Sequence, residues 1–386
     1  MTDLNRDGSH ILEGTSVILR KLNGSRLIQM RMRRNAPATV ENLKFKLDAA
    51  LIGKRYGIYN VKNGMLAQEA TEEEISDFKN VCASNAETDE IEEANGQQRG
   101  NQVQLVREKV QLKQAKRALT LVQIERANPR LLAEYYYARS VETVGYLRAD
   151  HIAYSIEMSG IIPSSRVLIF DQCNGVVATH VIERLNGDGH CVLLHSGTNP
   201  DNIVPCINAC QFSKTVLSTY RTLPVQRLLE PTTNVNEKAN ENNVAEQDQK
   251  MIESNGYKLK RKFAKEVDPK QRELEDEALS WFKTDGIENF GRYDSLFVIC
   301  RNADACAVLD KTLSAVRTSG TVVVYSPNSS VISAARGYLE KNACVFTTIR
   351  SFQQREIQVL KHRTHPLMQQ LIPGGFILTG IRCYHP

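Results

Sequence analysis

The sequence predicts an α/β plus β fold, in which a small N-terminal β-barrel-like domain precedes a larger Rossmann-like domain with a doubly wound sheet. Three observations predict it: short alternating strand runs up to Leu66, alternating strand and helix patterns after Pro163, and a sharp change of charge between them. The chain of 386 residues is long enough for two cores, because a single core rarely grows beyond roughly 250 to 300 residues.

The first domain is expected over residues 1–82. Alternating runs are typical of half-buried strands, and the pairs Asn23-Gly24 and Asn63-Gly64 are hairpin turn signals. The strand runs are Thr15–Arg20, Leu27–Arg31 and Tyr56–Asn60. Thr71 followed by Glu74 is a capping-box pattern, which predicts a short helix to about Val81.

Charge is segregated along the chain. From Gly14 to Leu66 there are eleven Lys or Arg against two acids, a net charge of +9, whereas Ala67 to Gln98 has ten acids against one Lys, a net charge of −9. A basic domain attracts nucleic acid and an acidic segment repels phosphate. The polar residues that follow predict an acidic loop and a charged helix, which together link the two domains over residues 83–130.

Five cations of the first domain are the best candidates for RNA phosphate contacts: Arg31, Arg33, Arg34, Lys54 and Arg55. Alternate residues of a strand share a face, so Arg31 and Arg33 are expected to project together. The alternative is a solvated strand edge, where cations discourage edge pairing. RNA contact is favoured because the whole domain carries the positive excess.

The second domain is expected over residues 131–386. Buried strand runs alternate with helical patterns, which predicts a mainly parallel sheet covered on both faces. Expected strands are Arg166–Phe170, Gly189–His195, Ser295–Cys300, Gly320–Tyr325, Cys344–Ile349 and Phe376–Ile381, and expected helices are Leu131–Arg139, Val176–Leu185, Ala303–Val316 and Ser330–Lys341. Residues 229–270 are polar and lack a period, which predicts a disordered insertion.

The turn after the first strand of this sheet decides the chemistry, because open α/β sheets bind ligands beyond the carboxyl ends of their strands. It reads Asp171-Gln172-Cys173-Asn174-Gly175. An active class I methyltransferase or a dinucleotide enzyme places several glycines here, since only glycine lets the backbone approach the cofactor closely. Cys173 and Val177 are therefore expected to project into the cofactor space, and the pattern predicts a degenerate cofactor site.

Two further loops lack the expected groups. The second strand ends in His195 without the acid that accepts hydrogen bonds from ribose hydroxyls. After the fourth core strand, Cys300-Arg301-Asn302 supply no evident general base. These losses predict a chain without catalytic or cofactor-binding residues, and a fold that never served methyl transfer is the alternative.

Several segments of the chain resemble one family. Val167–Ala178 and Ile182–Gly189 are similar to the matching segments of the non-catalytic subunit of the eukaryotic tRNA adenine-58 N1-methyltransferase. Tyr136–Arg139, Gln358–Leu360, His365-Pro366 and Gly374–Gly380 resemble the same family. The resemblance implies a β-barrel joined to a class I methyltransferase fold that binds tRNA without catalysing methylation.

The resemblance also implies an assembly. The expected partner is a homologous catalytic methyltransferase subunit, arranged with this chain as a heterotetramer that is a dimer of heterodimers. S-adenosylmethionine is expected in that partner and no cofactor in this chain, and the implied location is the nucleus. Two alternatives stay open: an active adenosylmethionine-dependent RNA methyltransferase with a divergent cofactor loop, and a stand-alone RNA-binding module. Of these three interpretations, only the non-catalytic subunit requires a homologous partner in a fixed ratio.

Other patterns carry weaker expectations. Cys173 at a helix N-terminus could be an activated thiol, although a buried structural thiol is favoured. Tyr135, Tyr136 and Tyr137 could stack on bases, but packing or an interface role is favoured. His362, His365, Cys383 and His385 lack metal-ligand spacing, so no metal is expected. No apolar stretch is long enough for a membrane span, and the polar N-terminus predicts an intracellular protein without a membrane partner.

Overall fold

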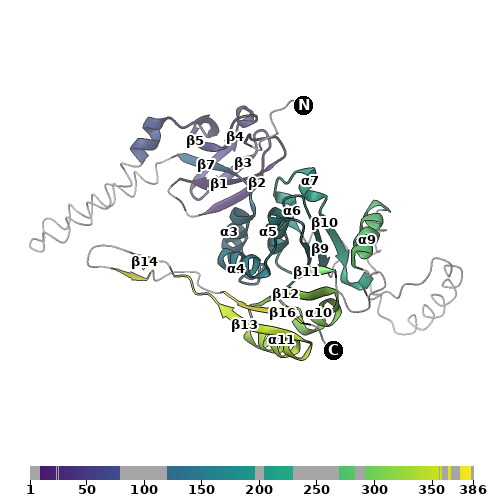
Figure 1. Ribbon diagram of the computed structural model, residues 1–386. Coiled ribbons are helices and arrows are strands. Elements are labelled where there is room, and N and C mark those ends of the chain that lie inside the picture. Colours follow the sequence, from purple (N-terminus) through teal and green to yellow (C-terminus); the bar gives the residue numbers. More distant parts are fainter. Residues whose placement is uncertain are drawn as a thin grey trace, which may run out of the picture.

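The computed structural model describes residues 9–22, 24, 26–78, 120–195, 204–228, 269–282, 292–355, 357–358, 364–366 and 374–383. These residues form two seven-stranded sheets and a two-stranded arm (Figure 1). One core cluster lies in the first sheet and one lies on each face of the second, where Ile18 of the first sheet also packs. Within the described ranges, no helix has both the length and the apolarity to cross a membrane.

The N-terminal sheet is curled and barrel-like, with strand order β2-β1-β7-β5-β6-β4-β3. Its strands are β1 Ser16–Lys21, β2 Leu27–Arg31, β3 Pro37–Val40, β4 Leu43–Leu47, β5 Gly57–Lys62, β6 Met65–Glu69 and β7 Leu121–Arg126, with a short 3-10 helix at Ala49–Leu51. Buried and exposed side chains alternate, so that Phe45 and Leu47 of β4 enter the core while Lys44 and Lys46 face outward. This alternation explains how so basic a segment forms a core.

Strand β7 corrects the predicted domain boundary. Its residues fall in the segment 83–130 that the sequence suggested as a linker, yet they pair with both β1 and β5 inside the barrel sheet. Leu121, Val122 and Ile124 are buried there, because the apolar residues of a strand with a partner on each side pack into the core of the barrel. The acidic loop and the charged helix expected around residues 83–117 lie outside the described residues.

The short helix after β6 begins as predicted. Thr71 Oγ1 accepts a hydrogen bond from the Glu74 backbone N–H at 3.2 Å, and the Glu74 carboxylate accepts one from the Thr71 N–H at 3.1 Å. These reciprocal bonds satisfy two backbone donors at the helix start. The helix is described through residue 78, so its expected end near Val81 lies outside the described residues.

The second sheet has the order β10-β9-β8-β11-β12-β16-β13. Strands β10, β9, β8, β11 and β12 are parallel, and β16 is antiparallel to both β12 and β13. The strands are β8 Arg166–Asp171, β9 His190–His195, β10 Tyr220–Pro224, β11 Tyr293–Ile299, β12 Val316–Ser326, β13 Cys344–Ser351 and β16 Phe376–Arg382. This is the predicted doubly wound architecture, closed at one end by an antiparallel pair.

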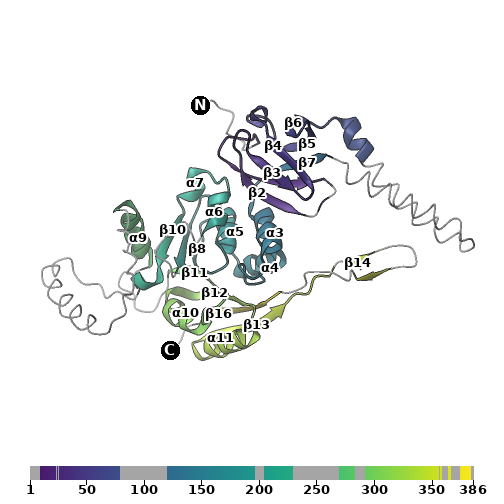
Figure 2. The ribbon, with the colours of Figure 1, turned by 180° about the vertical axis from the view of Figure 1, so that it is seen from behind.

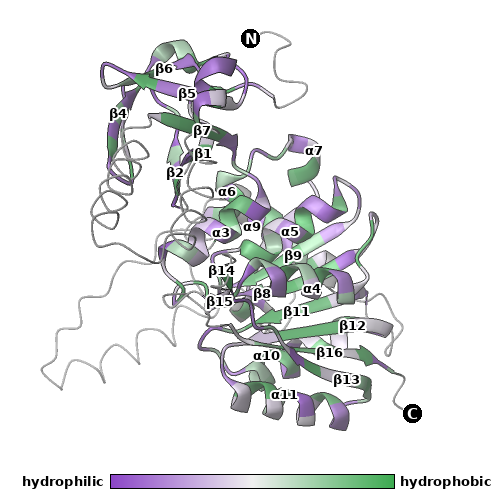
Figure 3. Cartoon of the chain, turned by 90° about the vertical axis from the view of Figure 1, so that its left-hand side faces the viewer, coloured by the Kyte–Doolittle hydropathy of each residue, from purple (hydrophilic) through white to green (hydrophobic). Residues whose placement is uncertain are grey.

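Helices cover both faces of this sheet, as the views in Figures 1 and 2 show. Those on one face are α3 Pro129–Arg139, α4 Ala149–Ser159, α5 Val176–Leu185, α6 Pro205–Ala209 and α7 Lys214–Leu217; those on the other are α9 Pro269–Phe282, α10 Ala305–Thr312 and α11 Ser329–Lys341, with 3-10 turns at Val225–Leu228 and Leu313–Ala315. Alternate residues of β8 enter opposite cores: Val167 and Ile169 on the α5 side, Leu168 and Phe170 on the α10 side. Strands buried on both faces are therefore nearly all apolar, as the green central strands of Figure 3 show.

A loop of the second domain is hydrogen-bonded to the barrel. Gln211, between α6 and α7, donates from Nε2 to the Ser16 carbonyl at 3.0 Å and lies 3.1 Å from the Tyr56 hydroxyl. The Gln211 carbonyl accepts a hydrogen bond from Arg126 at 2.6 Å. Strands β1 and β7 are thus tied to the Rossmann-like domain.

The insertion expected at 229–270 overlaps α9 by its last two residues, and residues 229–268 lie outside the described residues.

Candidate functional site

The turn between β8 and α5 is held by a buried carboxylate. Asp171 is 3% exposed, and its two oxygens accept hydrogen bonds from the backbone N–H groups of Cys173 at 2.6 Å and Val177 at 3.1 Å, with Ala178 N at 3.5 Å. Burial raises the pKa of Asp171 to about 6, although the N–H groups act in the opposite direction. The carboxylate satisfies backbone donors at the start of α5 and so replaces a cap from Gly175, which has no side chain.

Gln172 bridges the crevice where a cofactor would enter. The sheet order reverses between β8 and β11, and ligands of such sheets bind beyond that point. Gln172 Oε1 accepts three backbone hydrogen bonds from the loop after β11, from Arg301 at 3.0 Å, Asn302 at 3.1 Å and Ala303 at 3.0 Å. The two loops that would line a cofactor cleft are therefore joined to each other.

Arg301 and Cys173 lie beside this bridge. The exposed Arg301 donates to the Thr143 carbonyl at 3.3 Å, which ties the loop before α4 to the loop after β11. A Cβ on Gly145 would lie 3.3 Å from the Arg301 side chain and 3.4 Å from Cys173 Sγ. Cys173 is 0% exposed, and burial raises the pKa of its thiol well above the ordinary value. It is a packed structural thiol, not an activated nucleophile.

The start of α5 is covered from the other side. Asn174 and Gly175 both have left-handed backbone, with φ of 60° and 72°. A Cβ on Gly175 would lie 3.2 Å from Val204 Cα and Cγ1, so the glycine is needed for close packing against this chain's own loop. Val177, expected in the cofactor space, instead packs in the core beneath α5. The single glycine of the turn thus serves packing.

The ends of the neighbouring strands agree with this closure. His195, the last residue of β9, is 2% exposed and stands where a ribose-binding acid is usual. Cys300, directly after β11, is also buried, and burial raises its pKa to about 12. Among the described residues at this edge, the side chains are occupied with packing and with mutual hydrogen bonds. The arrangement stabilises the loops at this edge of the sheet.

The five basic candidates differ in exposure and in the contacts that their side chains make. Arg31, Arg33 and Arg55 are exposed, with Met32 buried between the first two, so the predicted alternation is observed. Arg34 lies 3.5 Å from the Glu13 carboxylate, and Lys54 donates to the Ala67 carbonyl at 2.9 Å. The Lys54 ammonium group is therefore partly occupied by a hydrogen bond within the barrel, whereas the four arginine side chains are exposed.

Backbone pairing explains why these cations lie near one another. Residue Ile11 exchanges hydrogen bonds with Gly53 and Lys54, both at 2.8 Å, while Gly14 and Thr15 bond to Met32, both at 2.7 Å. The segment 11–15 therefore lies between the Arg31–Arg34 stretch and the Lys54–Arg55 pair. The exposed Lys44 and Lys46 of β4 were not among the candidates, although their alternation with Phe45 and Leu47 was visible in the sequence.

The tyrosine triplet lies on helix α3. Asn128 caps this helix by accepting from the Leu131 N–H at 2.8 Å. Tyr136 is 7% exposed, and burial raises its pKa, while Tyr135 and Tyr137 pack partly against the same core. Packing on this helix is thus the observed role.

Metal binding has no support in the part of the chain that is described. No group of three or more His, Cys, Asp or Glu side chains is placed there to hold an ion. Of the four residues weighed in the sequence, His365 and Cys383 are described, whereas residues 362 and 385 lie outside the described ranges.

Comparison with known proteins supports one family. The model of the Gcd10p family matches residues 64–253, which include the β8–α5 turn. Over this segment the chain is similar to the Gcd10p family. The family resemblance read from the sequence is thereby confirmed.

The curated relatives that match this chain carry one description. The chain is 25% identical over 337 residues to "tRNA (adenine(58)-N(1))-methyltransferase non-catalytic subunit trm6" of Dictyostelium discoideum, which covers 85% of this chain and 64% of that protein. It is 23% identical over 449 aligned positions to the protein of the same description from Mus musculus, with 97% of this chain and 88% of that protein covered. The chain thus spans 64% of the length of the first relative.

Solved structures support the fold. A SAM-dependent O-methyltransferase from Thermotoga maritima matches with a TM-score of 0.55 at 8% identity, covering 100% of this chain and 99% of that one. At this identity the likeness concerns the fold, which confirms the predicted class I methyltransferase architecture.

Sequence reasoning missed the roles of Gln172, Arg301 and Val204 in joining the loops at this edge of the sheet. The only signal was negative, the missing glycines.

Proposed function

We propose that this chain is the non-catalytic, tRNA-binding subunit of a tRNA adenine-58 N1-methyltransferase complex. The observation that carries the proposal is the crevice closed by the chain's own Gln172, Arg301 and Val204. A methyltransferase fold whose cofactor space is occupied by side chains retains surfaces for assembly and for RNA, but lacks the means to bind the methyl donor. The descriptions of its relatives agree with this role.

The catalytic work then falls to a homologous partner subunit, which holds S-adenosylmethionine. We propose a heterotetramer formed as a dimer of two such heterodimers, located in the nucleus. One surface that fits a protein partner is the outer edge of the sheet. Strand β13 has no strand on its outer side among the described residues, and Val345 and Phe346 there are 40% and 81% exposed.

Phe346 supports this surface for a second reason. It lies at an irregularity in the β13–β16 register and has a φ of 53°, which is uncommon for a bulky side chain. An aromatic side chain held outward by strained backbone is a hypothesis for an interface anchor. Ile357 in the arm is 57% exposed and adds to the apolar surface available to a partner. Covering such side chains stabilises an assembly.

The barrel contributes RNA affinity in this proposal. Arg31, Arg33, Arg34 and Arg55 of the barrel domain present exposed charge. Each phosphate that they neutralise releases counterions, which makes binding depend steeply on salt. The barrel therefore positions tRNA by its backbone, and the partner reads and modifies the base.

Reconstitution tests the proposal. This chain, the catalytic subunit and their complex would each be assayed for methyl transfer to adenine 58 of tRNA. The proposal predicts transfer by the complex and none by this chain alone. Methylation by this chain alone would favour an active enzyme with a divergent cofactor loop. RNA binding without any association with the catalytic subunit would favour a stand-alone RNA-binding module.

A further inference from the structure

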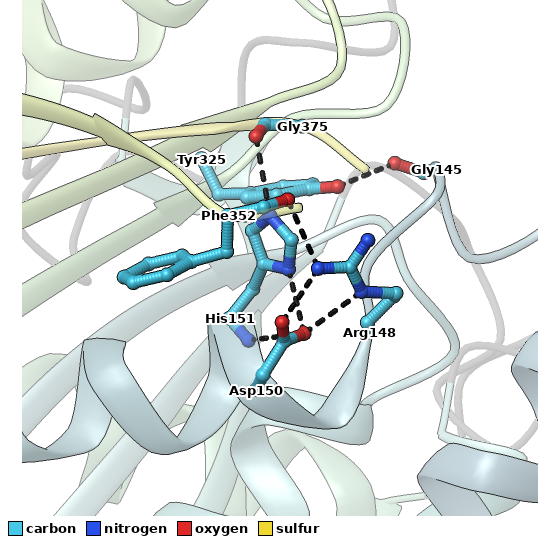
Figure 4. Close-up of polar contacts among 7 residues, drawn as sticks. All are labelled: Gly145, Arg148, Asp150, His151, Tyr325, Phe352 and Gly375. Carbon is cyan, nitrogen blue, oxygen red and sulfur yellow. Dashed lines mark hydrogen bonds and ion pairs between the residues drawn. The ribbon is translucent and has the colours of Figure 1, made fainter. Parts of the chain in front are cut away.

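One polar cluster joins helix α4 to both ends of the arm that contains β14 (Ile357–Gln358) and β15 (His365–Pro366) (Figure 4). Arg148, the N-cap residue of α4, donates to the Phe352 carbonyl at 2.9 Å. His151 Nε2 lies 3.2 Å from the Gly375 carbonyl. Phe352 directly precedes the arm and Gly375 follows it, so two side chains of one helix contact its two roots.

The second root approaches the cluster too closely for any side chain. A Cβ on Gly374 would lie 2.8 Å from His151 Cε1, and a Cβ on Gly375 would lie 2.5 Å from the Tyr325 ring and hydroxyl. Tyr325 is itself fixed, because its hydroxyl donates to the Gly145 carbonyl at 2.8 Å. The Gly374-Gly375 pair is therefore required for contact between this root and His151.

The hydrogen bonds of His151 depend on its charge. Its Nδ1 lies 3.0 Å from Asp150 Oδ1, so both ring nitrogens face acceptors. Only an imidazolium can donate from both nitrogens; a neutral ring donates from one. The side chain is fully buried, with Tyr325 of β12 and Phe352 packed edge-on at centroid distances of 5.8 and 5.5 Å.

The charged groups around His151 act against one another. Burial lowers the pKa of His151, the Asp150 carboxylate raises it, and the Arg148 guanidinium lowers it. Arg148 is paired with Asp150, and Tyr137 of α3 lies beside both. Of these groups, only the imidazole titrates near neutral pH, because arginine keeps its charge and buried tyrosine stays protonated.

We propose that His151 is a pH-dependent latch on the second root of the arm, closed on the Gly375 carbonyl when the ring is charged and open when it is neutral. A carboxylate accepts more strongly than a peptide carbonyl, so the single proton of the neutral ring stays on Nδ1, facing Asp150. The Gly375 contact is then lost. Arg148 holds Phe352 in both states, so one root is permanent and the other is switched. This inference stands apart from the proposed function.

The direction with pH follows from the sign of the shift. The pKa of His151 in the folded chain lies below its ordinary value of 6.5. The latch therefore closes when the pH falls through this lowered pKa. The unfolded chain binds the same proton more readily, so closing the latch lowers the free energy of unfolding in that range. Protonation of His151 therefore lowers the free energy of unfolding slightly while it orders the second root of the arm.

Hydrogen exchange on the full chain tests the latch. Rates corrected for intrinsic pH dependence would be measured from about pH 5 to pH 7.5, around the range of histidine titration. Amides 374–377 are expected to exchange roughly tenfold faster at the upper end, the effect of losing one hydrogen bond to a charged group. Amides 352–355, at the permanent root, serve as the internal control and should not change.

A variant and a spectroscopic measurement complete the test. His151→Phe keeps an aromatic ring between Tyr325 and Phe352 but cannot titrate, so its exchange at 374–377 should be independent of pH. Ring ¹⁵N shifts of His151 in the wild-type chain need no variant, and Nε2 should lose its proton before Nδ1. Exchange at 374–377 that ignores pH in the wild-type chain, or a ring that loses the Nδ1 proton first, would overturn the proposal.

Discussion

Replacing Asp171 by Ala should destabilise the chain more than any exposed cap does. The change leaves the backbone N–H groups of Cys173 and Val177 without their buried acceptor, since these bonds are 2.6 and 3.1 Å long and Asp171 is 3% exposed. A buried donor left unsatisfied costs about 1 to 3 kcal/mol, so two donors together suggest a loss of about 3 kcal/mol at neutral pH. The matched control is Asp304→Ala, which removes an exposed N-cap bond to Cys306 and should cost about 1 kcal/mol.

The same substitution has a pH dependence of definite sign. The pKa of Asp171 is raised from 3.8 to about 6 on folding, so the carboxyl stabilises the fold most at low pH and loses that contribution as the pH rises through 6. Asp171→Ala should therefore cost about 1 kcal/mol more at pH 5 than at pH 7. Urea unfolding at the two pH values measures both quantities. A cost no larger than that of Asp304→Ala, or one that grows with pH, would refute the reasoning.

Three further predictions concern the barrel, the arm root and the sheet edge. Replacing Arg31 and Arg33 by Gln should weaken tRNA binding by the complex and reduce the salt slope by about one per lost phosphate contact; unchanged affinity and slope would make them ordinary surface. Gly375→Ala should lower the free energy of unfolding by about 2 kcal/mol through overpacking, whereas Gly337→Ala, in open space on α11, should not lower it; equal effects would contradict the close approach. Phe346→Ser should weaken association with the catalytic subunit, measured by titration calorimetry, without lowering the melting temperature of the chain alone; wild-type affinity would remove this edge from the interface.

Local sequence patterns were sufficient for most of the second domain. Helix α5 has the predicted bounds Val176–Leu185, because its apolar residues follow the helical period and Gly175 lies directly before it. Strand β8 is one residue longer than predicted, since Asp171 continues the strand before its side chain turns back to the α5 N–H groups. Such elements depend on neighbours in sequence, which a pattern records.

Long-range pairing was not accessible in the same way. Strand β7 joins the barrel between β1 and β5, across more than fifty residues from β6, and nothing in Leu121–Arg126 says which sheet it enters. The filling of the crevice is similar. The missing glycines predicted that the cofactor turn is degenerate, but Gln172, Arg301 and Val204 meet only after the fold brings three separate loops together.

The His151 cluster shows what a motif can hide. The Gly374-Gly375 pair belongs to the segment that resembles the family, and its physical reason is close contact with His151 and Tyr325 from distant elements. The basic surface of the barrel could be predicted in part. Alternation predicted that Arg31 and Arg33 share a side, but it did not reveal that Lys54 is bonded to the Ala67 carbonyl.

Binding of S-adenosylmethionine tests the central claim most directly. Calorimetric titration would compare this chain alone with its complex with the catalytic subunit, at cofactor concentrations up to the millimolar range. Under the proposal that Gln172, Arg301 and Val204 close the crevice, the chain alone should give no heat of binding, and the complex should bind one cofactor per heterodimer. A saturable one-to-one isotherm for the chain alone would contradict the account.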